Sequence, residues 1–155
     1  MYILVLDQAT NNIGYAIFSA STNCLVTSGL HKTKGKTFDD KLKEINALID
    51  DIAYAYPLKH IVLEDVQSQS NKDTFKKLSI LMGVIIGYAN IHNISYTVVS
   101  VNTWRSKLKI PTHNRELAKQ SAVAYVLMNF GLELPHDQCE AICIGTWYVD
   151  TQKGA

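Results

Sequence analysis

Several features common in secreted and membrane proteins are scarce or missing in this sequence. It has three cysteines, Cys24, Cys139 and Cys143, and no C-x-x-C pair, so we expect buried thiols rather than a disulfide framework or a zinc knuckle. Its longest apolar run, residues 78–86, is too short to cross a bilayer. No basic leader precedes the first apolar stretch, so we expect no signal peptide, no membrane partner and a cytoplasmic location.

An excess of charge of one sign is also lacking. The formal net charge is +1 and charged residues make up 19% of the chain, which excludes a protein that binds nucleic acid through overall basicity. A length of 155 residues with 47% hydrophobic side chains is enough for one domain with its own core. We therefore expect a single domain over residues 1–155.

Hydrophobic periodicity predicts the element order β-β-β-α-β-α-β-α-α. The strands are expected over residues 2–7, 13–18, 24–33, 60–66 and 93–101. The helices are expected over residues 38–52, 73–91 and 115–130, and from His136 or Asp137 to about residue 149. Residues 101–111 are expected to be irregular, with Trp104 in the core. The inner face of the third helix is expected to consist of Leu117, Ser121, Ala124, Tyr125 and Met128.

A meander of three strands, followed by strands that alternate with helices, predicts a mixed five-stranded sheet flanked by helices. Right-handed crossovers favour the strand order 3-2-1-4-5. The first and fourth strands are then parallel neighbours, and their carboxyl ends meet at the edge where open α/β sheets bind ligands.

Acidic residues end both of these central strands. Asp7 closes the first strand, and Glu64 and Asp65 lie at the end of the fourth. Only one of the latter two can point at the site because strand side chains alternate, and Glu64 comes first and has the longer reach. A carboxylate at the end of a buried strand is disfavoured by desolvation unless a partner such as a cation neutralises it.

Two further acids lie on the last helix. Asp137 and Glu140 are three residues apart and share a face with Ala141 and Ile144, which must dock on the sheet. Four carboxylates without cysteine or paired histidine suit Mg²⁺ or Mn²⁺, and two such ions could support phosphodiester hydrolysis. Taken singly, each acid could instead cap a turn, mark a strand end or form an acidic first turn. Their joint placement favours a metal site.

The helix over residues 73–91 is apolar nearly all round between residues 78 and 86, which indicates contact on more than one side. Gly83 and Gly87 share one face, and small residues four apart let another backbone approach closely. That backbone could belong to a second subunit or to the same domain.

Three segments resemble the successive acidic motifs of RuvC-type Holliday junction resolvases, which have a ribonuclease H-like fold. They are V-L-D-Q-A-T-N-N-I-G-Y-A-I (residues 5–17), I-V-L-E-D-V (61–66) and H-D-Q-C-E-A-I (136–142). The chain looks most similar to the divergent resolvases of phages from Gram-positive hosts. The resemblance implies a homodimer with two Mg²⁺-dependent sites that nick symmetric strands of branched DNA. The four acidic positions would be Asp7, Glu64, Asp137 and Glu140.

The resemblance also implies roles for basic residues and for the apolar helix. Lys119 falls where the family carries a basic residue near the scissile phosphate, and Arg105 or Lys107 falls near another. Local clusters of basic residues, together with this resemblance, predict DNA contacts at Lys34, Lys36, Gln67, Lys72, Lys76, Arg105, Lys107, Lys109 and Arg115. The dimer interface implied is Leu78, Met82, Gly83, Ile86 and Gly87.

The sequence departs from the family pattern at three places. Gln8-Ala9 replaces the usual Pro-Gly, Glu140 stands where Asp is usual, and Gln67 replaces an aromatic that wedges at the junction. We therefore expect relaxed sequence preference and action on forks and flaps as well. The rival functions are a ribonuclease H-like nuclease acting on RNA or RNA:DNA hybrids, and a non-catalytic dimer that binds branched DNA.

Overall fold

This computed structural model describes residues 1–68 and 70–154. These residues contain five strands and five helices, joined by loops. The strands are β1 (Tyr2–Asp7), β2 (Asn12–Ser19), β3 (Leu25–Lys32), β4 (Leu58–Glu64) and β5 (Ser95–Val99). The helices are α1 (Phe38–Ala55), α2 (Lys72–Ile91), α3 (Val101–Lys107), α4 (Arg115–Phe130) and α5 (His136–Lys153).

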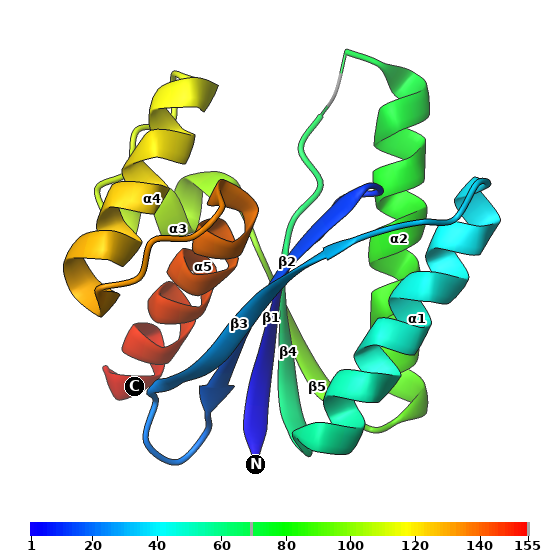
Figure 1. Cartoon of the computed structure of the whole chain (residues 1–155), viewed down its shortest axis with the longest axis horizontal. Helices are drawn as coiled ribbons and strands as arrows, with labels where there is room; N and C mark the ends of the chain where they lie inside the picture. Colours follow the sequence, from blue (N-terminus) through cyan, green and yellow to red (C-terminus); the bar gives the residue numbers. More distant parts are fainter. Residues whose placement is uncertain (69, 155) are drawn as a thin grey trace.

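The strands form one mixed sheet in the order β3-β2-β1-β4-β5, as the sequence predicts. β1 pairs antiparallel with β2 and parallel with β4, and β4 pairs parallel with β5. The carboxyl ends of β1, β4 and β5 therefore lie at the same edge of the sheet (Figure 1).

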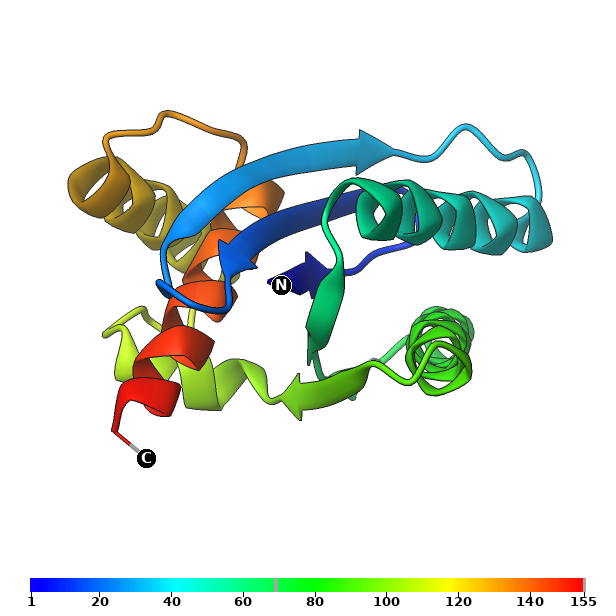
Figure 2. The same cartoon turned by 90° about the horizontal axis from the view of Figure 1, so that it is seen from below.

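Helices cover both faces of the sheet. Figure 1 shows α1 and α2 on one face and α3, α4 and α5 on the other, and the perpendicular view in Figure 2 shows the same separation. Side-chain alternation along β1 explains the two cores: Ile3 and Val5 pack toward α3, α4 and α5, whereas Leu4 and Leu6 pack toward α1 and α2. Asp7 continues the first series, so it faces α5.

Local capping defines where the helices begin and end. Thr37 and Asp40 form a capping box at the start of α1, and the Asn71 side chain accepts hydrogen bonds from two backbone N–H groups of α2. Asn114 caps α4 through the Leu117 N–H. Gly131 ends that helix in the left-handed conformation, with φ of 67°.

Two predictions about secondary structure and packing are wrong. Residues 101–107 are helical rather than irregular, because Ser100 caps them and Trp104 is fully buried against the sheet. The buried face of α4 consists of Ala118, Ala122 and Val126. These small side chains let α4 approach α5 closely. Of the predicted face, Tyr125 does pack against the core, whereas Leu117 and Met128 are exposed.

The prediction of buried thiols is confirmed for two of the three cysteines. Cys139 and Cys143 are buried, but Cys24 is exposed because it lies in the turn before β3. Across residues 1–68 and 70–154, no helix has the length and hydropathy needed to span a membrane.

Candidate active site

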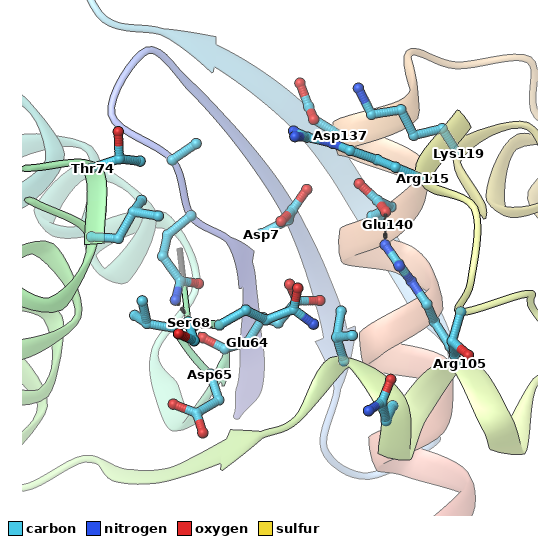
Figure 3. Close-up of a pocket in the computed structure, with 18 of the residues that line it drawn as sticks. Asp7, Glu64, Asp65, Ser68, Thr74, Arg105, Arg115, Lys119, Asp137 and Glu140 are labelled. Carbon is cyan, nitrogen blue, oxygen red and sulfur yellow. Dashed lines mark hydrogen bonds and ion pairs between the residues drawn. The ribbon is translucent and has the colours of Figure 1, made fainter. Parts of the chain in front are cut away.

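The site begins at the carboxyl ends of β1 and β4. Val62 on β4 packs in the core on the α5 side, so Glu64, two residues later, faces the same side. Asp65 is exposed, and in Figure 3 its carboxylate points away from Asp7 and Glu140. Of the two acids that the sequence left open, Glu64 is therefore the one that faces α5.

Helix α5 adds the other two acids. The carboxylates of Asp7, Asp137 and Glu140 each offer one oxygen, and these oxygens lie within 4.8 Å of one another. Glu140 is buried, as expected for an acid on the docking face of α5. Gly14, the neighbour of Asp7 on β2, makes this approach possible, because a Cβ atom there would lie 2.0 Å from the Asp137 carbonyl oxygen.

A pocket of about 520 Å³ opens over these acids. It extends from α5 to the first turns of α2, where Thr74 and Leu78 line it (Figure 3). Arg115 and Lys119 of α4 also line it, and Figure 3 shows both on the Asp137 side. The pocket therefore combines acids at its centre with basic side chains at one wall.

Helix α3 contacts two of the acids directly. The Trp104 indole Nε1–H donates a hydrogen bond to Glu64 Oε2 at 2.7 Å. Arg105 Nη2 donates to Glu140 Oε1, also at 2.7 Å. The sequence predicted Trp104 only as a core residue. The available signal was that a buried tryptophan near a strand end needs an acceptor for its N–H.

Gln8, the first of the departures from the family pattern, ties the two central strands together. Its Nε2 donates a hydrogen bond to the backbone carbonyl of Glu64 at 2.6 Å. The side chain after Asp7 thus holds the end of β4 beside the end of β1.

Burial and repulsion between the carboxylates raise the pKa values of Asp7 and Glu64, the two acids at the strand ends. Desolvation raises the pKa of Asp7 well above its ordinary value, and the negative charges of Glu140, Glu64 and Asp137 raise it further. Desolvation also raises the pKa of Glu64, to about 7, although the hydrogen bond from Trp104 opposes this shift. Such repulsion is relieved when a cation binds between the carboxylates.

The donor set fits a hard divalent cation. Oxygen atoms of carboxylates are the ligands that Mg²⁺ and Mn²⁺ prefer, and the buried cysteines lie outside the pocket lining. His136 contacts Asp137, with its Nε2 atom 2.9 Å from Oδ1. This contact suits a residue that orients the Asp137 carboxylate.

The remaining predicted contact residues are distributed around the same edge of the sheet. Gln67 is exposed and lines the pocket. The other lysines are exposed and lie outside the pocket lining: Lys34 and Lys36 before α1, Lys72 and Lys76 at the start of α2, and Lys107 and Lys109 around the end of α3. Arg105 is largely buried and pairs with Glu140, so its guanidinium is already engaged.

The comparisons with known proteins agree with this geometry. The family model for the crossover junction endodeoxyribonuclease RuvC matches residues 3–143. The chain belongs to the RuvC family. The RuvC of Sulfurovum sp. is 26% identical over 165 residues, covering 99% of this chain and 98% of that protein. The RuvC of Campylobacter jejuni is 28% identical over 152 residues, covering 93% of this chain and 92% of that protein.

Solved structures show the same fold. T. thermophilus RuvC in complex with a Holliday junction substrate has a TM-score of 0.80 at 13% identity, covering 99% of this chain and 96% of that chain. Fowlpox virus resolvase, in complex with Holliday junction DNA, has a TM-score of 0.66 at 15% identity, covering 98% of this chain and 99% of that chain. The predicted ribonuclease H-like fold and RuvC-type resemblance are confirmed. The similarity to phages of Gram-positive hosts stays a prediction.

RuvC-family membership also confirms the predicted activity class, an endodeoxyribonuclease directed at crossover junctions, and implies use of a divalent metal. The identity of the metal, the number of ions and the roles of single residues are taken up below as proposals.

The pKa of Glu64 predicts how the stability of this RuvC-family protein depends on pH without metal. The folded pKa of about 7 lies above the ordinary value of 4.5, so the unfolded chain loses this proton first as the pH rises. Stability should therefore fall between about pH 4.5 and 7. Glu64→Gln should remove this loss and stabilise the protein at pH 8 by about 1–3 kcal/mol.

Urea unfolding in EDTA at pH 5 and pH 8 measures this effect. Glu133→Gln, which neutralises an exposed acid outside the pocket lining, is the matched control. Equal stability of Glu64→Gln and wild type at pH 8 would show that Glu64 is not destabilised by its surroundings.

Proposed function

We propose that this RuvC-family protein is a Mg²⁺-dependent endonuclease that resolves Holliday junctions by paired nicks, and that it acts in the cytoplasm. The observation that carries the proposal is that one carboxylate oxygen from each of Asp7, Asp137 and Glu140 lies within 4.8 Å of the other two. Glu64 lies at the end of the adjacent strand. These acids come from two strands and one helix, and they face a pocket with basic side chains at its wall.

In this proposal the four acids Asp7, Glu64, Asp137 and Glu140 hold two Mg²⁺ ions, for which Mn²⁺ can substitute. When bound, such ions lower the pKa of a water molecule and stabilise negative charge on the leaving oxygen. The chain itself fixes the carboxylates and positions the DNA strand. Lys119 is half-buried in the pocket wall beside Asp137, which suits contact with the phosphate that is cleaved.

DNA contacts are proposed along the edge of the sheet that carries the acids. Arg115 and Gln67 border the pocket, and exposed lysines flank it on the loop before α1, on α2 and around the end of α3. Such side chains bind phosphates and so position DNA without reading its sequence. The proposed flanking residues are Lys34, Lys36, Lys72, Lys76, Lys107 and Lys109. A role for Arg105 in DNA binding would require release of its pairing with Glu140.

Relaxed sequence preference is proposed from Gln67. This side chain is exposed and polar at the position where the resemblance places a wedging aromatic. An amide cannot stack between bases as an aromatic ring does, so we infer cleavage of forks and flaps in addition to four-way junctions.

A homodimer is proposed through α2. A Cβ atom placed on Gly83 or Gly87 would meet no other atom within 4 Å, so no part of the described chain packs closely on these glycines. This finding argues against close packing within the same domain, the alternative that the sequence left open. Leu78, Met82 and Ile86 are only half-buried and would complete the interface.

Gly83→Arg should convert the dimer to a monomer without unfolding it, because the new side chain points into open space in one subunit but blocks a partner helix. Sedimentation equilibrium measures the expected change in mass. Gly154→Arg makes the same substitution at an exposed position beyond α5 and should remain dimeric. A dimeric Gly83→Arg protein would rule out this interface.

The function is tested by incubating the protein with labelled four-way junction, fork, linear duplex and RNA:DNA hybrid, each with Mg²⁺, Mn²⁺ or EDTA. Symmetric paired nicks in the four-way junction that require metal are the expected result, with weaker cleavage of the fork. Preferential cleavage of the hybrid would favour the RNA-directed rival. Tight junction binding without cleavage in either metal would favour the non-catalytic dimer.

A further inference from the structure

Two consecutive residues of α3 each hold one oxygen of a different acid. Trp104 donates its Nε1–H to Glu64 Oε2 and Arg105 donates from Nη2 to Glu140 Oε1, both at 2.7 Å. Hydrogen bonds of this kind, in which a carboxylate accepts from an aromatic N–H or a guanidinium, are directional. Each acid is therefore held through one of its two oxygens by a residue of α3.

The residues that make these contacts are themselves well fixed. Trp104 is fully buried in the core between the sheet and α5. The Arg105 guanidinium carbon lies 5.1 Å from the centroid of the Trp104 ring, and its side chain is 13% exposed. The two side chains thus form one packed unit.

The helix that carries them is anchored to the strand beside Glu64. Glu64 pairs in register with Val99 of β5, and the Asp65 N–H donates to the Val99 carbonyl at 2.8 Å. The next residue, Ser100, caps α3 by accepting from the Thr103 N–H. Because β4, β5 and α3 are connected in this way, the position of the indole N–H is fixed relative to the end of β4 that carries Glu64.

We propose that Trp104 is a positioning residue for metal binding, which presents Glu64 to a divalent cation through Oε1 alone, with Arg105 acting in the same way on Glu140. This inference rests on the proposed metal-dependent function and adds to it two residues outside the acidic set. The hydrogen bond from Trp104 keeps the Glu64 carboxylate from moving into the cluster of Asp7, Asp137 and Glu140. Asp7 then lies in the cluster with the two acids of α5, and Glu64 is offered separately from the adjacent strand.

Packing alone would give a different result from positioning. A tryptophan that only fills space can be replaced by a residue of similar shape without changing metal affinity, whereas a residue that orients a ligand cannot. Loss of a group that orients a metal ligand typically weakens metal affinity or activity by about 10- to 100-fold. The hydrogen bond, rather than the ring, is the feature to remove.

The chain offers a matched control because it has two tryptophans. Trp147 is half-buried on α5 and lies outside the pocket lining. Trp104→Phe should raise the Mg²⁺ concentration for half-maximal junction cleavage by about 10- to 100-fold, and Trp147→Phe should leave it unchanged. Mn²⁺ binding to the free protein, measured by electron paramagnetic resonance, should weaken in parallel in Trp104→Phe alone. Junction affinity in EDTA should stay the same in both variants.

A second replacement separates lost packing from the lost hydrogen bond. In the Trp147→Phe background, Trp104→3-benzothienylalanine keeps the size and shape of the ring but has sulfur in place of the N–H. It should reproduce the metal defect of Trp104→Phe with a smaller loss of thermal stability, because the packing of the ring is kept and only the hydrogen bond is lost.

The outcomes distinguish the two proposals. If wild type cleaves junctions with metal and both Trp104 variants keep the wild-type Mg²⁺ midpoint and Mn²⁺ affinity, the positioning role is wrong while the proposed function stands. If wild type does not cleave, the proposed function is wrong, and the Mn²⁺ affinities alone decide whether Trp104 orients a metal ligand.

Discussion

Asp7→Asn is expected to reduce junction cleavage by at least about 10²- to 10³-fold while leaving junction binding intact. Asp7 lies where the end of the central strand meets α5, and it is the one strand acid grouped with both acids of that helix. An amide has nearly the same shape as a carboxylate, so the strand and its neighbours should not move. It has no charge to attract a divalent cation, so the metal-dependent step should fail.

Stability should change in the opposite direction from activity. The charges of Glu140, Glu64 and Asp137 oppose ionisation of Asp7, and desolvation does so still more strongly. Removing the charge of Asp7 should therefore stabilise the metal-free protein at neutral pH. A thermal denaturation curve in EDTA records this shift, and it shows that lost cleavage does not result from unfolding.

Asp65→Asn is the matched control for this prediction. Asp65 follows Glu64 directly, but it is exposed and points away from the other acids (Figure 3). Asp65 also lines the pocket, but because its carboxylate is exposed and turned away from the other acids, the same chemical change there should reduce cleavage far less than Asp7→Asn does. Cleavage by Asp7→Asn at the wild-type rate would refute the metal site.

Gly14→Ala is expected to have the largest effect on the fold. A Cβ atom on Gly14 would lie 2.0 Å from the carbonyl oxygen and 2.4 Å from the carbonyl carbon of Asp137. Both contacts involve backbone, so neither can be relieved by rotating a side chain. Overpacking of this kind costs about 1–3 kcal/mol, and the start of α5 should shift away from β1.

Cleavage should therefore fall together with stability, because the displaced helix carries Asp137 and Glu140. Gly29→Ala, on the adjacent strand β3, is the control. The atoms nearest to a Cβ there belong to the end of the Tyr15 side chain rather than to backbone, so rotation of that side chain can relieve part of the clash and the loss of stability should be smaller. Urea unfolding and junction cleavage measured on both variants test the difference. Equal stability of the two variants would show that α5 does not depend on the close approach at Gly14.

Much of the fold follows from hydrophobic pattern. The alternation along residues 2–7 and the helical spacing from Phe38 to Ile52 fix which faces are buried, and right-handed crossovers leave one strand order. That order brings Asp7 and Glu64 to one edge. The spacing of Asp137 and Glu140 then assigns both to the docking face of the last helix, so the four acids could be predicted together.

The features that the sequence did not predict depend on packing between distant segments. The apolar residues of α4 surround much of the helix, so the pattern alone could not show that Ala118, Ala122 and Val126 are buried against α5. Helix α3 has seven residues, too few for a periodic signal, and it forms because Ser100 caps it and Trp104 docks on the core. The bond from Trp104 to Glu64 spans 40 residues and becomes visible only in three dimensions.

The acidic cluster joins a strand near the start of the chain to a helix near its end. During synthesis on the ribosome, the acids of β1 and β4 emerge long before Asp137 and Glu140. A nascent chain that has not yet released α5 therefore lacks half of the proposed ligands and cannot cut DNA. The order of the elements along the chain thus delays the proposed metal site until α5 has been synthesised.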